Sequence, residues 1–246
     1  MSRAFVRFAA YFVSLVVAGA APAQEEQGRT RFILAASWQP AFCQTNQQKP
    51  ECSSQTKERF DATNFSLHGL WPLRQNYCGV SKDVQAADKD GDWQKLPEVK
   101  LTPENTAALD KVMPGTQSGL ERHEWTKHGT CAKMSADDYF GVATRLISDL
   151  NGSAVRELFA ENVGKTLKAD QIKAAFDKSF GAGAGERVNM SCRRAGGARV
   201  ISELTIGLSE DAGSAEKAGA GLAKLIQSAG HTSFGCDQGV VDAAGF

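Results

Sequence analysis

Short segments of alternating or continuous apolar residues predict β-strands at four places in the chain. The mostly apolar run at 31–38 predicts a buried strand that ends before Pro40. Residues 64–72 alternate apolar and polar side chains, so His68 should face away from Leu67 in a half-buried strand. The same alternation predicts strands at 187–192 and 200–208.

Apolar positions spaced three and four residues apart predict helices elsewhere. Thr102 followed by Pro103 is a typical helix start, and we expect this helix to end at 113–115. An amphipathic helix should begin after Ser135 and stop at Asn151. Shorter scaffold helices are expected at 155–159 and 172–180.

A further short helix is expected at 121–128. Ser118 and Glu121 have the spacing of a capping box, and Gly129 is a natural helix end. From 123 to 131 the sequence reads His-Glu-Trp-Thr-Lys-His-Gly-Thr-Cys. So dense a group of titratable side chains is unusual for either a solvated surface or a packed core.

At about 100° per residue, Glu124 and His128 share one face of this helix, and His123 and Lys127 share the adjacent face. One face offers a carboxylate and an imidazole, and the other offers two potential cations. A zinc-protease helix needs histidines four residues apart, whereas these are five apart, about 140° around the helix. A surface helix with a chance histidine cluster is the other alternative.

The N-terminus has the pattern of a signal peptide. Two arginines flank the start of an apolar run at 8–21, and an Ala-Pro-Ala cleavage motif ends at Ala23. We expect residues 1–23 to be removed and residues 24–246 to form a single domain, periplasmic or secreted. The run is short for a membrane span, and an uncleaved anchor is the alternative.

Export fits the six cysteines, which are Cys43, Cys52, Cys78, Cys131, Cys192 and Cys236. An even number predicts disulfides, but spacing alone permits fifteen pairings. Cys43 and Cys52 are the obvious local pair, closing a polar loop at 44–56. No two cysteines have the spacing of a zinc knuckle.

The net charge limits how the chain could bind a nucleic acid. Without Arg3 and Arg7 the chain has 26 basic and 28 acidic residues, a net charge of −2. A tight, non-specific nucleic-acid binder would be basic overall, so a polyanion would have to be held by a local cluster.

Other charged stretches have simpler interpretations. The acidic segment 88–92 resembles a calcium loop, but Val99 stands where the bidentate acid belongs, so we expect a solvated turn. His231 lies in a polar stretch and is interpreted as a surface histidine. Three arginines should lie on the connection between the last two strands: Arg193, Arg194 and Arg199.

The second stretch with candidate chemistry is His-Gly-Leu-Trp-Pro at 68–72. Taken alone, His68 would be a core histidine with satisfied hydrogen bonds. Together with the helix histidines it predicts acid–base chemistry, in which one imidazole takes a proton and another gives one. Gly69 permits a close approach, and Trp71 is a flat surface on which a base could stack. With a cation to stabilise a phosphorane, the set suits cleavage of RNA by its own 2′-hydroxyl, without metal or covalent intermediate.

The stretches at 68–72 and 123–131 resemble the two active-site segments of the ribonuclease T(2) family, in the same order. The similarity extends more loosely through 37–43 and 139–141, and is of the kind seen in exported bacterial members of broad specificity. The resemblance implies an α+β fold, with a central antiparallel β-sheet flanked by several helices. It also implies the disulfides Cys78–Cys131 and Cys192–Cys236.

The resemblance implies a role for each residue of the site. His128 would be the general base for the 2′-hydroxyl, and His68 the general acid for the departing 5′-oxygen. Glu124 and Lys127 would stabilise the transition state, and His123 would help hold the phosphate. The product would be a 2′,3′-cyclic phosphate and then a 3′-phosphate. No cofactor is implied, a monomer is expected, and DNA should not be cut because it lacks the attacking hydroxyl.

Two positions depart from the family pattern. Leu73 and Leu120 stand where many members have an acidic or amide residue and an aromatic residue, respectively. A leucine neither hydrogen-bonds a base edge nor offers a π-face, so we expect weak base preference.

Two function classes follow from these residues. The first is an exported endoribonuclease acting on single-stranded RNA, and the second is a non-catalytic relative that binds RNA or a partner. The complete set of His68, Glu124, Lys127 and His128 favours the enzyme. A serine or cysteine hydrolase is excluded, because the chain lacks a nucleophile motif.

Overall fold

The computed structural model describes residue 1 and residues 28–209 and 221–245. Apart from Met1, the expected signal peptide at 1–23 lies outside the described residues. No helix in the described ranges combines the length and the apolarity that a membrane crossing requires.

The centre of the fold is a six-stranded sheet with the order β2-β1-β5-β6-β3, in which β4 also pairs with β5. All pairings are antiparallel except the short contact of β5 with β6. The prediction of an α+β fold around a central antiparallel sheet is confirmed. The strands are β1 (Phe32–Ser37), β2 (Ser66–Pro72), β3 (Thr166–Lys168), β4 (Val188–Ala195), β5 (Ala198–Leu208) and β6 (Gln238–Val240).

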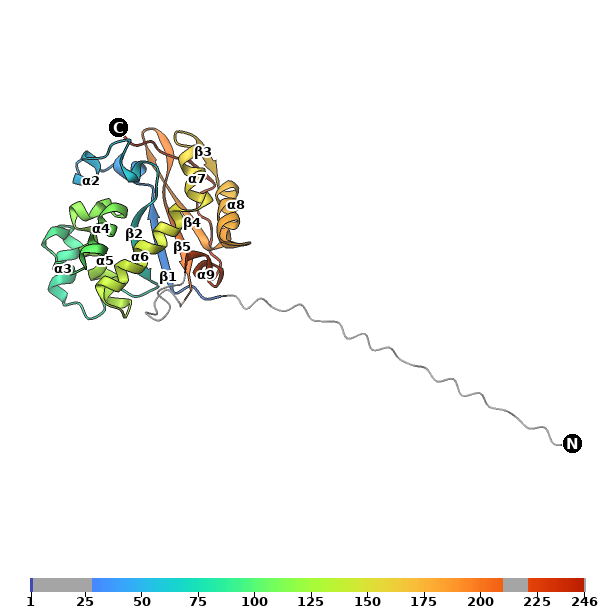
Figure 1. Cartoon of the computed structure of the whole chain (residues 1–246), viewed down its shortest axis with the longest axis horizontal. Helices are drawn as coiled ribbons and strands as arrows, with labels where there is room; N and C mark the ends of the chain where they lie inside the picture. The colour runs from blue at the N-terminus through green and yellow to red at the C-terminus, as the bar shows by residue number, and fades with distance from the viewer. Residues whose placement is uncertain (2–27, 210–220, 246) are drawn as a thin grey trace.

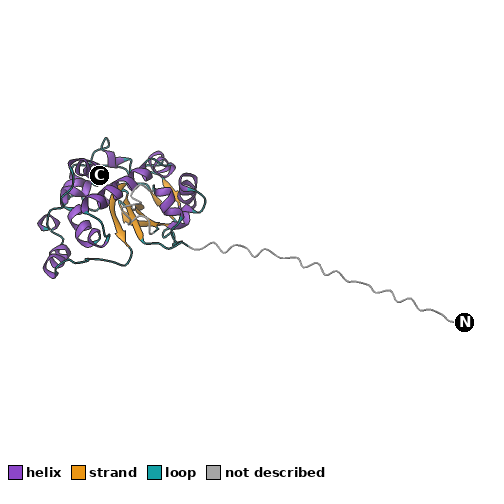
Figure 2. Ribbon diagram, turned by 60° about the horizontal axis from the view of Figure 1, so that its bottom comes forward, coloured by secondary structure: helices purple, strands orange, loops and turns teal. Residues whose placement is uncertain are grey.

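Helices lie to either side of the strands in Figure 1, and Figure 2 shows the strands among them. In Figure 1, α6 crosses the sheet between a group formed by α2 to α5 and a group formed by α7 to α9. The helices are α1 (Gln39–Cys43), α2 (Pro50–Ser53), α3 (Lys82–Asp90), α4 (Pro103–Val112), α5 (Leu120–Lys127), α6 (Ala136–Asn151), α7 (Ala154–Glu161), α8 (Ala169–Phe180) and α9 (Leu222–Gln227).

The four predicted strands are present, with two local differences. After β1 the chain does not simply stop at Pro40 but turns into α1, because proline is well tolerated in the first helical turn. Gly196 and Gly197 both have positive φ and form a two-residue turn between β4 and β5. This tight turn lengthens both strands, so the three arginines predicted on the connection lie on strands instead: Arg193, Arg194 and Arg199.

The helix starts at Thr102 and Ser135 are confirmed, since each side chain accepts a backbone N–H of the first turn. The prediction of a solvated turn at 88–92 is confirmed for the exposed turn at 91–92 and wrong for the start of the segment, which is helical. Residue Asp88 lies near the end of α3 and is 2% exposed. This helix starts at an N-cap, Ser81, and ends at Gly91 with φ 83°, a pair of signals that the acidic composition obscured.

The helix predicted at 121–128 is α5, but its capping box is absent. Gly119, with φ 82°, precedes the helix and no side chain caps it. The hydroxyl of Ser118 donates instead to the buried Glu51 (3.0 Å), so a distant carboxylate competes with the local cap. The α-helical turns end at Lys127, and His128 leads into a short 3₁₀ helix, Gly129–Cys131.

The core fixes β2 against α6. The buried side chain of Asn151 at the end of α6 bonds both backbone groups of Phe65, accepting from its N–H (2.8 Å) and donating to its carbonyl (2.9 Å). Tyr139 donates from its hydroxyl to the carbonyl of Leu70 (2.7 Å). Because the chain is tied to one helix just before β2 and again at Leu70, the strand that carries His68 is held in place.

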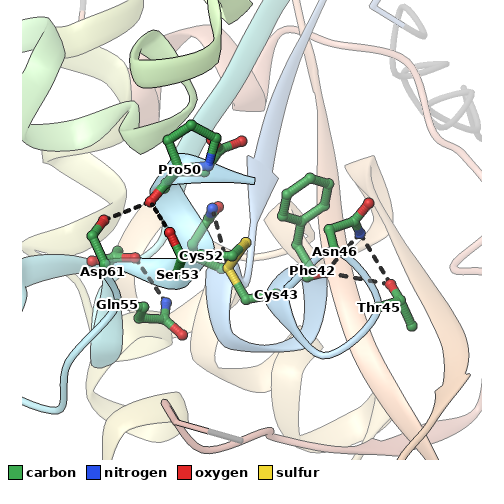
Figure 3. Close-up of a disulfide and its surroundings, with 12 residues drawn as sticks. Phe42, Cys43, Thr45, Asn46, Pro50, Cys52, Ser53, Gln55 and Asp61 are labelled. Carbon is green, nitrogen blue, oxygen red and sulfur yellow. Dashed lines mark hydrogen bonds between the residues drawn. A yellow bond between two sulfur atoms is a disulfide. The ribbon is translucent and has the colours of Figure 1, made fainter. Parts of the chain in front are cut away.

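Three disulfides join the cysteines. Cys43–Cys52 links α1 to α2 as predicted, and Figure 3 shows the hydrogen-bonded turn between them. In that turn the side chain of Asn46 donates to the carbonyl of Phe42 (2.8 Å). The pairings implied by the family resemblance are also present: Cys78–Cys131 and Cys192–Cys236.

Removing the Cys78–Cys131 bond should destabilise the protein markedly. The bond joins the loop after β2 to the end of α5 across a sequence separation of 53, which limits the unfolded ensemble strongly. For the double variant Cys78→Ala/Cys131→Ala we expect a loss of about 2–4 kcal/mol in the free energy of unfolding, measured by urea denaturation. A loss below about 1 kcal/mol would contradict this expectation.

Candidate active site

A β-bulge in β2 presents His68. Ala35 of β1 pairs with Gly69, and Ala36 pairs with Leu67, so His68 is an extra residue without a partner on β1. Bulges re-aim side chains and occur frequently beside active sites. Leu67 is 1% exposed, whereas the side chain of His68 is 35% exposed, and the opposite orientation of the two side chains stays a prediction.

A carboxylate from β5 holds the inner nitrogen of His68. Nδ1 of the imidazole lies 2.6 Å from Oε2 of Glu203 and donates to it. Ser37 of β1 donates its hydroxyl to the same oxygen (3.3 Å). The sequence interpretation did not single out Glu203, although it is the only acidic residue in β5.

Glu124 lies between two imidazoles. It is 1% exposed, and its Oε2 accepts from Nε1 of Trp71 (2.7 Å). Its Oε1 has no hydrogen-bond partner among the described residues and lies 3.7 Å from Nε2 of His68 and 3.8 Å from Nε2 of His123. A Cβ at position 69 would lie 1.9 Å from Oε2, so Gly69 is what allows this carboxylate to approach β2.

His123 is held on two sides by residues that the sequence interpretation missed. Nδ1 lies 2.6 Å from Oδ1 of Asp88, whose Oδ2 accepts from the hydroxyl of Tyr77 (2.7 Å). Trp93 stacks on the imidazole with ring centroids 4.3 Å apart at 20°. His68 and His123 are therefore built alike, because each has a carboxylate on Nδ1 and its Nε2 near Glu124.

His128 has a different environment. It is 8% exposed, and its Nδ1 has no hydrogen-bond partner within the described part of the chain. Its ring lies 5.4 Å from that of Trp71 and 6.5 Å from that of His123. Trp71 also contacts His68 at 5.1 Å, so the indole separates and positions the two imidazoles. Base stacking on Trp71 stays a prediction.

These environments shift the pKa values of His68 and His128 in opposite directions. Burial lowers the pKa of His68, but the hydrogen bond to Glu203 and the charges of Glu124 and Glu203 outweigh it, so the pKa lies above 6.5. For His128, burial and the neighbouring charges of Lys127 and His123 all lower the pKa, to about 3. At neutral pH one imidazole is prepared to give a proton and the other to accept one.

Burial and neighbouring charges also shift the pKa values of Glu124 and His123. Burial raises the pKa of Glu124 to about 7, against the opposing effects of His68 and Trp71. Burial also lowers the pKa of His123 despite the hydrogen bond to Asp88. Lys127 has no ion pair in the described ranges, and its charge reaches His68, His123, Glu124 and His128. The structure thus brings all the predicted site residues together.

A pocket of about 120 Å³ adjoins His68. Leu120 and Trp93 line it, and Lys49 lies 5.2 Å above the Trp93 ring. Leu73, the second position that differs from the family pattern, is exposed and lines a separate hollow. His231 lines the same hollow and is exposed, as predicted. The described residues include no group of three or more histidine, cysteine or acidic side chains that could hold a metal ion.

The sequence matches proteins of a known family. The profile of the Ribonuclease T2 family matches residues 29–218. Ribonuclease I of Escherichia coli (strain K12) is 33% identical over 211 residues, which cover 74% of this chain and 76% of that protein. Ribonuclease T2 of Danio rerio is 26% identical over 184 residues, which cover 72% and 68%.

Structural similarity agrees with this at the level of the fold. Japanese pear S3-RNase has 18% identity and a TM-score of 0.50, over 72% of this chain and 84% of that one. The family profile covers most of the chain and includes both histidine segments of the site. The chain therefore belongs to the ribonuclease T2 family.

Proposed function

We propose that this protein is an endoribonuclease that cleaves single-stranded RNA by transphosphorylation to 2′,3′-cyclic phosphates, which it then hydrolyses to 3′-phosphates. Family membership supports the endoribonuclease activity. The observation that carries the mechanism is the contrast between His68, which has a carboxylate on Nδ1, and His128, which has none. An acid and a base of opposite tuning are what an in-line transfer between two oxygens requires.

His128 serves as the general base. Its lowered pKa leaves the imidazole neutral at physiological pH, so it can accept the proton of the 2′-hydroxyl. The 2′-oxygen then forms a bond to phosphorus while the bond to the 5′-oxygen breaks. His68 gives its proton to that departing oxygen. In the second stage water replaces the leaving alcohol, and the two imidazoles exchange roles.

The other three polar groups act on the phosphate. The positive charge of Lys127 stabilises the negative charge that develops on the phosphate oxygens in the transition state. Glu124, with a pKa of about 7 and an unpartnered Oε1, is partly protonated at neutral pH and can donate to a non-bridging oxygen. His123, held by Asp88, completes the binding of the phosphate.

Several properties follow from this proposal. The reaction uses the chain's own acid and base, so no metal or cofactor is required, and the enzyme acts as a monomer. Leu120 offers the pocket beside His68 an apolar contact, which favours weak base preference. The three disulfides and the signal-peptide pattern at 1–23 support a periplasmic or secreted location. The two differently tuned imidazoles would serve no purpose in a binding-only relative.

The dinucleoside phosphate UpU, treated in EDTA, tests the proposal. We expect uridine 2′,3′-cyclic phosphate to accumulate first and the 3′-phosphate to follow, monitored by liquid chromatography. The analogue with a 2′-deoxy sugar at the cleaved position is the matched control and should stay intact, since it lacks the nucleophile. Cleavage of that analogue, or loss of activity in EDTA, would refute the mechanism.

A further inference from the structure

Glu203 is placed by the sheet itself. It pairs in register with Ser37 of β1, on a long strand that has β4 along its other edge. Its Oε2 receives two hydrogen bonds, one from Ser37 on β1 and one from His68 on β2. Three strands therefore fix one carboxylate oxygen, and the side chain is 19% exposed.

This contact decides which nitrogen of His68 faces the site. Because the Nδ1 proton is donated to Glu203, the second proton of the charged imidazole resides on Nε2. Nε2 faces Glu124 at 3.7 Å, and the ring lines the pocket. The bulge at His68 and the carboxylate at position 203 thus act together to aim a proton at the site.

We propose that Glu203 is the positioning residue of His68, fixing its ring and keeping it protonated for its work as general acid. The inference rests on the proposed function, in which His68 protonates the departing 5′-oxygen. Glu203 does not touch the substrate in this scheme and acts through the imidazole alone.

The charges around His68 support this role. Glu203 on β5 supplies both a hydrogen bond and a negative charge, whereas Glu124 on α5 supplies only a charge. The charge of Lys127 lowers the pKa of His68, and the protonated forms of His123 and His128 also repel the charged imidazole. Of these groups, Glu203 is the one whose hydrogen bond favours the charged imidazole.

The variant Glu203→Gln keeps the shape of the side chain and removes its charge. We expect the pKa of His68, followed by NMR of the ring proton, to fall relative to wild type. A general acid works below its pKa, so the descending limb of kcat/KM against pH should move to lower pH. On UpU at neutral pH, kcat should fall about 10–100-fold with little change in KM, less than the full contribution of a general acid.

A second substrate separates this role from a merely structural one. Uridine 3′-(4-nitrophenyl phosphate) releases a phenolate that needs no proton, so its cleavage should lose less than about threefold in Glu203→Gln. The matched control Glu161→Gln, at the exposed end of α7, should leave both substrates unaffected. Equal losses on the two substrates would overturn the proposal, and so would an unchanged pKa of His68.

Two further measurements keep the test decisive. If Glu203→Gln does not fold, Glu203→Asp withdraws the carboxylate from Nδ1 and should lower the pKa of His68 in the same direction. If the wild-type protein does not cleave UpU, the proposed function fails. The NMR titration would still show whether Glu203 controls the protonation of His68, because it needs no substrate.

Discussion

The variant His128→Ala should lose about 10²–10⁴-fold in kcat on UpU, and His68→Ala should lose a similar factor. Each removes one of the two proton transfers on which the reaction depends. The two variants should differ on uridine 3′-(4-nitrophenyl phosphate), whose leaving group needs no acid. There His128→Ala should still lose the full factor, because the 2′-hydroxyl still has to be deprotonated, while His68→Ala should recover most of its rate.

The exposed His231 is the matched control for this pair. It lies outside the site, so His231→Ala should retain wild-type rates on both substrates. Full activity in either His68→Ala or His128→Ala would refute the assignment of that histidine. The reverse pattern on the activated substrate would mean that the acid and the base are exchanged.

Replacing Lys127 by methionine should lower kcat by about 10²–10³-fold and change KM much less. The ammonium group has no ion pair in the described residues, and its charge acts on the three histidines of the site and on Glu124. It is therefore available to the charge that develops only in the transition state. The same field lowers the pKa of His128, so Lys127→Met should also move the ascending limb of the pH profile to higher pH.

A lysine on the opposite side of the molecule provides the control. Lys178 is exposed on α8, which Figure 1 places away from α5. Lys178→Met removes the same charge and should leave kcat unchanged. If Lys127→Met raised KM while kcat stayed constant, Lys127 would be a ground-state binding residue and the assigned role would be wrong.

Much of the fold was predictable because its signals are local. Caps at Thr102 and Ser135 satisfy amides a few residues away, so the helices that follow them can be identified from spacing alone. Cys43 and Cys52 are close in sequence and pair as expected. The capping box at Ser118 failed for the opposite reason, since its hydroxyl is taken by Glu51, 67 residues away.

The candidate site residues were also predictable, but the carboxylates that hydrogen-bond to them were not. The segments at 68–72 and 123–131 carry the histidines, the lysine and Glu124 in a recognisable order. Asp88 looked like part of a solvated turn, and Glu203 looked like an ordinary residue of a strand. Only the folded chain shows that these two carboxylates bind the Nδ1 atoms of two site histidines.

The sequence by itself determined four of the strands, the longer helices, the family and the side chains proposed for the chemistry, because periodicity, caps and motif order act over a few residues. The tertiary structure decided how the two imidazoles differ, with the pKa of His68 raised above its ordinary value and that of His128 lowered. That distinction depends on burial and on the carboxylate of Glu203, 135 residues from His68, which approaches only when strands and helices pack. A bulge that shifts the pairing of β2 by one residue is equally invisible to an alternating pattern, yet it aims His68 at the site.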